Sequence, residues 1–370
     1  MSDGIAESQV VGIDLHLHRS VIARIDERGN ELGWIRVEND PKTLIAECRK
    51  AGRGAPVAIE ATYGWYWAVD ALLAAGFEVH LAHPLGLKAL RKRKRVKTDP
   101  RDAYELANLL RLGSLPEVYI APPDLRELRE LVRHRRQLVK LSTSVKAGMR
   151  ALLAKHNIRL SATQLDSDTA TGLMDALSLP GTYAQRLASQ RRLMLVLAEE
   201  IASVEVDLHD RLRHRPGYCN LLKVKGIGPI LAAVFVAEIG EVTRFPTAGA
   251  LCCWAGLTPR HYESDKTVPS MRRGRISKEG DALIRWAAVE AIQRQTEPAV
   301  KAVKDGIIAR RGKNVRNIAK VAAARKMLEV VYYVLRDGQA RLSLVKCFGP
   351  TSRREFWPRL GGRRVIAVRG

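Results

Sequence analysis

The sequence predicts a chain in three parts: an amino-terminal α/β domain with a mixed sheet, a helical middle region and a mainly helical carboxyl-terminal region. Residues 8–37 alternate apolar and polar side chains, which is typical of half-buried strands. Apolar residues then recur at intervals of seven from residue 131, which indicates long paired helices. After residue 216, apolar stretches of helical character continue between glycine-containing turns.

The amino-terminal domain is predicted over residues 8–118. The stretch "QVVGIDLHLHRSVIARIDERGNELGWIRVE" contains the turn signal "ERGNE" and predicts long antiparallel strands joined by a hairpin. We predict a helix for "PKTLIAECRKAG", a short buried strand for "APVAIEAT", a helix for "GWYWAVDALLAAG" and a strand for "FEVHLAHP". With a final helix, the order β-β-β-α-β-α-β-α predicts an α/β domain whose sheet is mixed.

The middle region, residues 119–215, is predicted to be an antiparallel hairpin of two long helices. Arg135 and Ser142 interrupt the apolar seam of the first helix. The pattern therefore fits both a helical core within one chain and a coiled coil between chains. The seam residues are Leu131, Leu138, Val145 and Leu152 in the first helix, and Leu187, Met194, Leu197, Ile201, Val204 and Leu208 in the second.

The carboxyl-terminal region is predicted over residues 216–345, followed by a basic tail over residues 346–370. The stretch "LLKVKGIGPILAAVFVAEIG" places Gly226 and Gly228 in a tight turn between two helical segments. This turn resembles a helix-hairpin-helix element, whose backbone N–H groups can hold a phosphate. After residue 299 the sequence predicts two more helices with basic faces. The tail is expected to order on a partner.

The charge balance points to a polyanionic partner. The chain has 62 Lys and Arg against 39 Asp and Glu, a net charge of +23, and nucleic acid is the commonest polyanion that such proteins bind. No apolar run approaches the roughly 20 residues of a membrane-spanning helix. The amino terminus lacks a signal-peptide pattern, so we expect a cytoplasmic protein. The five cysteines are scattered without a C-x-x-C pair, which indicates neither a zinc site nor a disulfide framework.

Four acids are candidate metal ligands. Asp14 lies in the apolar strand "VGIDLH", Glu60 ends the strand "VAIEAT", and Asp99 and Asp102 lie one turn apart where a helix is predicted to begin. A ribonuclease H type domain needs an acid on its first strand, one at the end of a later parallel strand and a pair on a following helix, which together hold two divalent cations. The order of these acids therefore predicts a metal site.

The same residues also have structural interpretations. Asp99 followed by Pro100 is typical of a helix N-cap, with Asp102 meeting the free N–H groups of the first turn. His16 and His18 alternate with Asp14 along a strand and could be metal ligands. Two histidines on a hairpin are more often surface or packing residues, and we interpret them so.

A run of five cations directly precedes the acidic pair of the helix. These cations would guide a nucleic-acid backbone toward carboxylates whose metal ions let a polyanion approach. The alternative is a solvated basic loop. The run consists of Arg91, Lys92, Arg93, Lys94 and Arg95.

Several motifs, taken in order, carry a resemblance to a known family. They are "GIDLH", "IEAT", "KTDPRDA", "AGLTPR", "RRGRISKEGDALIR" and "VAAARKMLEVVYYVLRDG". Together they resemble the DEDD transposases of insertion sequence family one-hundred-and-ten, the bridge-RNA-guided serine recombinases, from about residue 10 to residue 338. The resemblance implies a RuvC-like domain that binds Mg²⁺, with Mn²⁺ also acceptable to hard oxygen ligands. The implied acidic tetrad is Asp14, Glu60, Asp99 and Asp102.

The resemblance also implies a catalytic serine after the "GLTP" element at residues 256–259, and Ser264 is the expected nucleophile. The family usually has a Ser-Gly pair there, whereas this chain has Asp265 next and a longer spacer before its arginines. Ser270 and Ser277 therefore stay alternatives. Phosphates would be held by the cations that follow, Arg272, Arg273, Arg275 and Lys278.

The function implied by the resemblance is DNA strand cleavage and exchange that excises and inserts a mobile element through a phosphoserine intermediate. The implied partners are double-stranded DNA at the element ends and target, a structured noncoding guide RNA, and further copies of the chain in a dimer or tetramer, with active centres built from two subunits. The protein would then work at the nucleoid. A metal-only junction nuclease and a non-catalytic architectural protein remain as alternatives.

Overall fold

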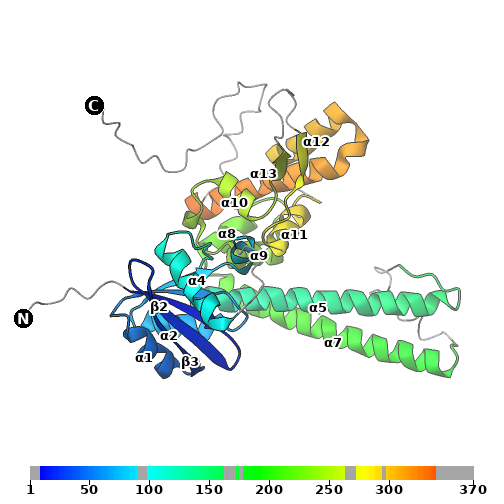
Figure 1. Ribbon diagram of the computed structural model, residues 1–370. Coiled ribbons are helices and arrows are strands. Elements are labelled where there is room, and N and C mark those ends of the chain that lie inside the picture. The colour runs from blue at the N-terminus through cyan, green and yellow to red at the C-terminus, as the bar shows by residue number, and fades with distance from the viewer. Residues whose placement is uncertain are drawn as a thin grey trace, which may run out of the picture. The chain divides into compact units, whose positions relative to one another are not determined.

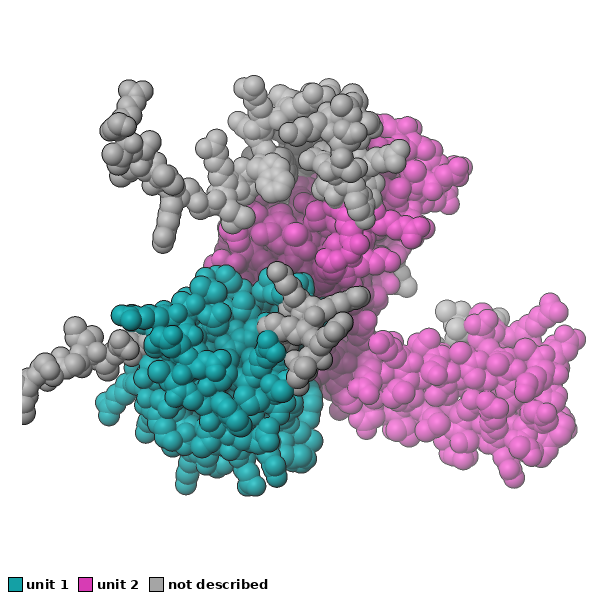
Figure 2. Space-filling view, in the orientation of Figure 1, with its two compact units in different colours: residues 1–121 teal, residues 122–370 magenta. Residues whose placement is uncertain are grey.

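The computed structural model describes residues 9–90, 98–161, 178–262, 272–293 and 297–338, together with Leu165, Gly172 and Met174. The chain divides into two units, residues 1–121 and residues 122–370 (Figures 1 and 2). Within the described ranges, every helix is too short or too polar to cross a bilayer.

A five-stranded mixed sheet with the strand order β3-β2-β1-β4-β5 forms the centre of the first unit. The first three strands pair antiparallel, whereas β1, β4 and β5 run parallel to one another. This topology confirms the predicted ribonuclease-H-like, RuvC-like α/β fold. The elements are β1 (Val10–Leu15), β2 (Arg19–Ile25), β3 (Glu31–Glu38), α1 (Pro41–Arg49), β4 (Pro56–Glu60), α2 (Trp65–Ala74), β5 (Glu78–Ala82), α3 (Pro84–Leu90) and α4 (Asp99–Arg111).

The alternation of side chains in β1 separates two layers of core. Its odd-numbered residues pack with buried residues of α1 and α2 on one face of the sheet. Val10 packs with Ala107 of α4 on the other face. Since alternate residues of a strand share a face, Gly12 and Asp14 also point toward the α4 side.

Gly12 allows α4 to lie directly on β1. A Cβ at this position would stand 1.9 Å from the carbonyl oxygen of Ala103 in α4, so any side chain must push the helix away from the sheet. We predict that Gly12→Ala lowers the free energy of unfolding by about 1–3 kcal/mol or more, measured by chemical denaturation. Gly64→Ala is the control, because open space surrounds Gly64 and its φ is −104°. Equal stability of the two variants would contradict this packing.

The second unit combines a long helical hairpin with a cluster of shorter helices. Its elements are α5 (Pro123–Ala154), α7 (Gly181–Leu212), α8 (Pro216–Leu222), α9 (Pro229–Ile239), η2 (Val242–Arg244), α10 (Ala248–Trp254), β6 (Pro259–Tyr262), β7 (Arg272–Ile276), α11 (Ala282–Glu290), α12 (Pro298–Arg311), η3 (Lys313–Val315) and α13 (Arg316–Asp337). The region after the sheet domain is thus mainly helical, as the sequence predicts.

Helices α5 and α7 lie side by side over their length (Figure 1). The two polar residues that interrupt the predicted seam have partners inside this hairpin. Arg135 forms an ion pair of 2.6 Å with Glu205, and the Ser142 hydroxyl lies 3.6 Å from the Met194 sulfur. Rising numbers on α5 meet falling numbers on α7, so the helices are antiparallel. Pairing between chains stays a prediction.

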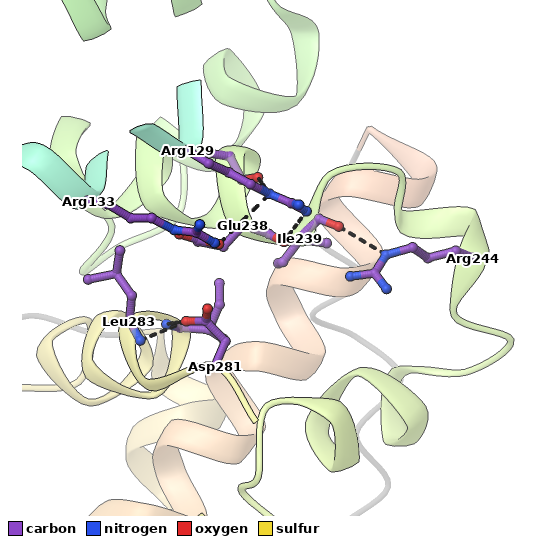
Figure 3. Close-up of polar contacts among 9 residues, drawn as sticks. Arg129, Arg133, Glu238, Ile239, Arg244, Asp281 and Leu283 are labelled. Carbon is purple, nitrogen blue, oxygen red and sulfur yellow. Dashed lines mark hydrogen bonds and ion pairs between the residues drawn. The ribbon is translucent and has the colours of Figure 1, made fainter. Parts of the chain in front are cut away.

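A buried carboxylate joins α5 to α9. Glu238 is 2% exposed, and Arg133 donates to both of its oxygens at 2.9 and 2.8 Å (Figure 3). Arg129 donates to the carbonyl oxygens of Ala237 and Glu238. Bidentate pairs of this kind fix the relative orientation of the elements that carry them. The base of the helical hairpin is therefore held against α9 by side chains from one turn of α5.

Candidate functional site

The neighbouring strands β1 and β4 end with predicted acids. Ile13 lies opposite Ile59 in their parallel register, so Asp14 and Glu60 take the next position on each strand and point to the same face. That face is covered by α4, whose first turn contains Asp99 and Asp102. The structure therefore places all four acids at one end of the sheet.

Asp14 and Asp99 meet at the side chain of His16. The His16 Nε2 lies 3.1 Å from the Asp14 Oδ2 and 3.8 Å from the Asp99 Oδ1. One ligand atom from each of these residues falls within 4.8 Å of the others. Arg36 donates to the other oxygen of Asp99 at 3.1 Å. Asp14 and Asp102 are buried, while His16 and Asp99 are more open to solvent.

The N-cap interpretation of Asp99 is wrong. Helix α4 begins at Asp99, and its N-cap is Thr98, which makes no side-chain capping bond. The carboxylate of Asp99 instead binds Arg36 and lies near His16. Asp99 is thus the first residue inside the helix, and its carboxylate contacts Arg36 of β3 and lies near His16, which follows β1.

His16 is exposed, as the surface interpretation expects, but its ring lies against Asp14 and Asp99, and Arg36 was not among the predicted site residues. The contact between His16 and Asp14 fits the sequence spacing, because residues two apart in an extended chain share a face. Arg36 gave no such signal. It stands in a row across three strands, with Asp14 opposite Val21 and Val21 opposite Arg36, and this row depends on strand register.

Burial raises the pKa of Asp14, His16 opposes the rise, and the charges of Asp102 and Asp99 add to it. Because folding raises the pKa of Asp14, the ionised carboxylate destabilises the folded protein at neutral pH. This destabilisation is absent below the pKa that Asp14 has in the unfolded chain. It is complete once the pH has risen through the higher pKa that Asp14 has in the folded protein. We predict that, with a chelator present, Asp14→Asn has a higher melting temperature than the wild type at about pH 7. The difference between the two melting temperatures should disappear toward about pH 3. Thermal unfolding across this range tests the prediction. A lower melting temperature for the variant at neutral pH contradicts it.

The donor set suits a hard divalent cation. Carboxylate oxygens are the ligands that Mg²⁺ and Mn²⁺ prefer. In the structure, two nitrogen-containing side chains, His16 and Arg36, already lie against the carboxylates. Burial is the main cause of the raised pKa of Asp14, and the charges of Asp102 and Asp99 add to it; a bound cation would favour the ionised carboxylate against both effects. Among the described residues, Asp14 and Asp99, with His16 beside them, have ligand atoms close enough to share one ion, and the metal roles of Glu60 and Asp102 stay predictions.

The predicted phosphate-binding turn lies between α8 and α9. Gly226 has a φ of 98°, and Gly228 is the N-cap of α9. The amide of Lys225 in the same turn donates to the buried carboxylate of Glu297 at 2.9 Å. A carboxylate therefore already occupies one amide of the turn, and phosphate binding by Gly226 and Gly228 stays a prediction.

In the sequence, Ser264 falls between β6 and β7, two strands that pair as a short antiparallel hairpin. The base of this hairpin is closed by the Ser277 amide, which donates to Thr258, and by the Lys278 amide, which donates to Gly256. Arg272 and Arg273 lie on β7, and Arg275 and Lys278 are exposed. Ser264, Ser270 and the cations Arg91, Lys92, Arg93, Lys94 and Arg95 lie outside the described residues.

Comparison with known proteins gives two family matches. Residues 11–158 match the transposase model of the IS110 DEDD type, and residues 219–304 match the model "Transposase IS116/IS110/IS902 family". The two matches together span more than half of the chain. The chain belongs to the IS110 family of transposases. The first match contains all four acids of this IS110-family transposase, and the second contains Ser264.

Individual relatives of this transposase are distant. It is 28% identical over 229 residues to a "Probable family 20 transposase" of Pseudomonas aeruginosa, covering 60% of this chain and 64% of that protein. It is 26% identical over 283 residues to a protein of Sinorhizobium fredii named as a transposase, covering 74% and 68%. Among solved structures it matches Thermus thermophilus RuvC in complex with a Holliday junction at 17% identity and a TM-score of 0.23, covering 30% of this chain and 99% of that one.

Proposed function

We propose that this IS110-family transposase cleaves and exchanges DNA strands to excise and insert a mobile element, guided by a structured noncoding RNA. The observation that carries the proposal is the convergence of the acids: Asp14 and Asp99 lie around His16, and Glu60 and Asp102 stand at the same end of the sheet. Together with the family membership, this arrangement favours metal-assisted phosphoryl transfer. Bound Mg²⁺ or Mn²⁺ would neutralise charge on the reacting phosphate.

In this reaction, Ser264 and the basic residues that follow it would have separate roles. Attack by the Ser264 hydroxyl oxygen on a DNA phosphorus forms a serine–phosphate bond and breaks one phosphodiester P–O bond. The serine proton is balanced by the proton that the leaving DNA oxygen gains as a free hydroxyl. The phosphoserine link keeps the bond energy for joining a new strand. Arg272, Arg273, Arg275 and Lys278 would hold the flanking phosphates.

The proposed partners follow from charge and family. A net charge of +23 suits DNA at the element ends and target together with a guide RNA. The tetrad and Ser264 belong to different units of the chain, which is consistent with active centres built from two subunits of a dimer or tetramer. We place the protein in the cytoplasm at the nucleoid.

A metal-only junction nuclease is the second candidate, since all four acids belong to one unit of the chain, without the serine. A denaturing gel separates the two functions. The wild-type protein is mixed with end-labelled element DNA, RNA transcribed from the adjoining noncoding region, and Mg²⁺ or a chelator. We expect a metal-dependent covalent protein–DNA adduct. Cleaved ends without an adduct would favour the nuclease, and binding without cleavage would favour an architectural protein.

A further inference from the structure

We infer that His16 is a direct nitrogen ligand of the divalent cation held by Asp14 and Asp99, and that the site therefore binds Mn²⁺ more tightly than Mg²⁺. The inference rests on the proposed function in one respect, namely that a cation binds these carboxylates. It adds an imidazole to the four acids predicted from the sequence.

The distances around His16 fit a shared cation. Two ligand atoms on adjacent corners of an octahedron, each about 2.1 Å from the ion, lie about 3 Å apart. The His16 Nε2 and the Asp14 Oδ2 are 3.1 Å apart. The Asp99 Oδ1 lies 3.8 Å from the same nitrogen, and small side-chain rotations would bring it to a third corner. The hydrogen bond between His16 and Asp14 would then give way to two bonds to the ion.

The backbone of His16 is fixed before any ion binds. Its amide donates to the carbonyl oxygen of Arg19 at 3.1 Å, which closes the turn between β1 and β2. The Asn39 side chain donates to the carbonyl oxygens of His16 and Leu17 at 2.7 and 3.0 Å. Asn39 in turn accepts a hydrogen bond of 2.6 Å from the buried Ser20 hydroxyl. These contacts fix the backbone that carries the imidazole, and a metal ligand gains affinity when its position is fixed before the ion binds.

Asp99 is fixed by a second support. Arg36 donates to its Oδ2 at 3.1 Å and leaves Oδ1 facing His16. The bound oxygen orients the carboxylate, and the other oxygen is directed into the cluster. His18, two residues beyond His16, is exposed and is no member of the cluster within the described part of the chain. The chain thus supplies a matched histidine that should not act as a ligand.

An imidazole changes which ion the site prefers. Mg²⁺ takes oxygen ligands and gives up water reluctantly, whereas first-row transition ions accept imidazole nitrogen readily. A site of carboxylates alone would serve Mg²⁺ and Mn²⁺ alike. One nitrogen among the ligands adds affinity for Mn²⁺ and little for Mg²⁺.

The test uses Mn²⁺ itself, with the full chain and without DNA. Electron spin-echo envelope modulation of bound Mn²⁺ reports a directly bonded ¹⁴N nucleus, and titration of free Mn²⁺ gives the affinity. We expect nitrogen coupling in the wild type and in His18→Ala, and none in His16→Ala or His16→Gln. His16→Ala should weaken Mn²⁺ binding by about 10–100-fold and change Mg²⁺ binding much less. His16→Gln keeps a donor for Asp14, and thermal unfolding shows whether each variant is folded.

Two results would overturn the inference, and they differ. If wild-type Mn²⁺ is bound without nitrogen coupling, His16 is only a hydrogen-bond partner of Asp14, and the carboxylate site stands. If the wild type binds no Mn²⁺ at all, both the ligand role of His16 and the proposed metal site fail.

Discussion

Asp14→Asn is expected to reduce DNA strand cleavage by at least about 10³-fold while the protein remains folded. The amide keeps the size of the carboxylate but loses the charge and the second oxygen acceptor that a cation needs. Since ionised Asp14 sits in a buried, acid-rich position, the variant should be at least as stable as the wild type without metal. Loss of activity in a more stable protein would separate a catalytic role from a structural one. Gel quantification of labelled element ends gives the rate.

The control for this prediction is a carboxylate at the opposite end of the same sheet. Glu78 lies at the start of β5, opposite Pro56 at the start of β4, whereas Glu60 lies at the far end of that pair. Glu78→Gln removes one exposed negative charge from the same unit and should leave cleavage unchanged. Comparable cleavage by Asp14→Asn and the wild type would remove the tetrad from the mechanism.

The strand or helix that carries each acid was predictable, because β1, β4 and α4 each have a clear pattern in a short stretch of the sequence. "VVGIDL" and "PVAIE" are short apolar runs that read as buried strands, and Asp99 and Asp102 are one helical turn apart whatever surrounds them. The sequence contains a glycine at position 12, but it does not show why a glycine is required there. Only the approach of the Ala103 carbonyl oxygen shows why no side chain fits there.

The arrangement around the acids was less predictable because it depends on contacts across strands. Arg36 reaches Asp99 through the pairing of β3 with β2, and Asn39 reaches the His16 backbone from the end of β3. Neither contact has a sequence signature, since both join residues more than 20 positions apart. The Glu297 carboxylate at the Lys225 amide is a similar case, because it fills part of a turn that the sequence presents as open.

Ser264→Ala is expected to abolish the covalent protein–DNA adduct completely, because the alanine side chain has no oxygen that could form an ester with phosphorus. DNA and RNA binding should persist, since neither the basic segments nor the tetrad is altered. Filter binding or gel shift measures the retained affinity, and the denaturing gel measures the adduct. Ser277→Ala is the matched control: the Ser277 amide closes the base of the β6–β7 hairpin through Thr258, and alanine keeps that amide.

The pattern across three serine variants decides the chemistry. If the adduct disappears only with Ser264→Ala, Ser264 is the nucleophile despite the departure from the usual Ser-Gly pair. If Ser270→Ala or Ser277→Ala removes it instead, that serine, which lies closer in sequence to Arg272 and Arg273 than Ser264 does, is the nucleophile. If all three variants cleave DNA like the wild type and no adduct forms, water is the attacking group, and the four acids alone carry the reaction.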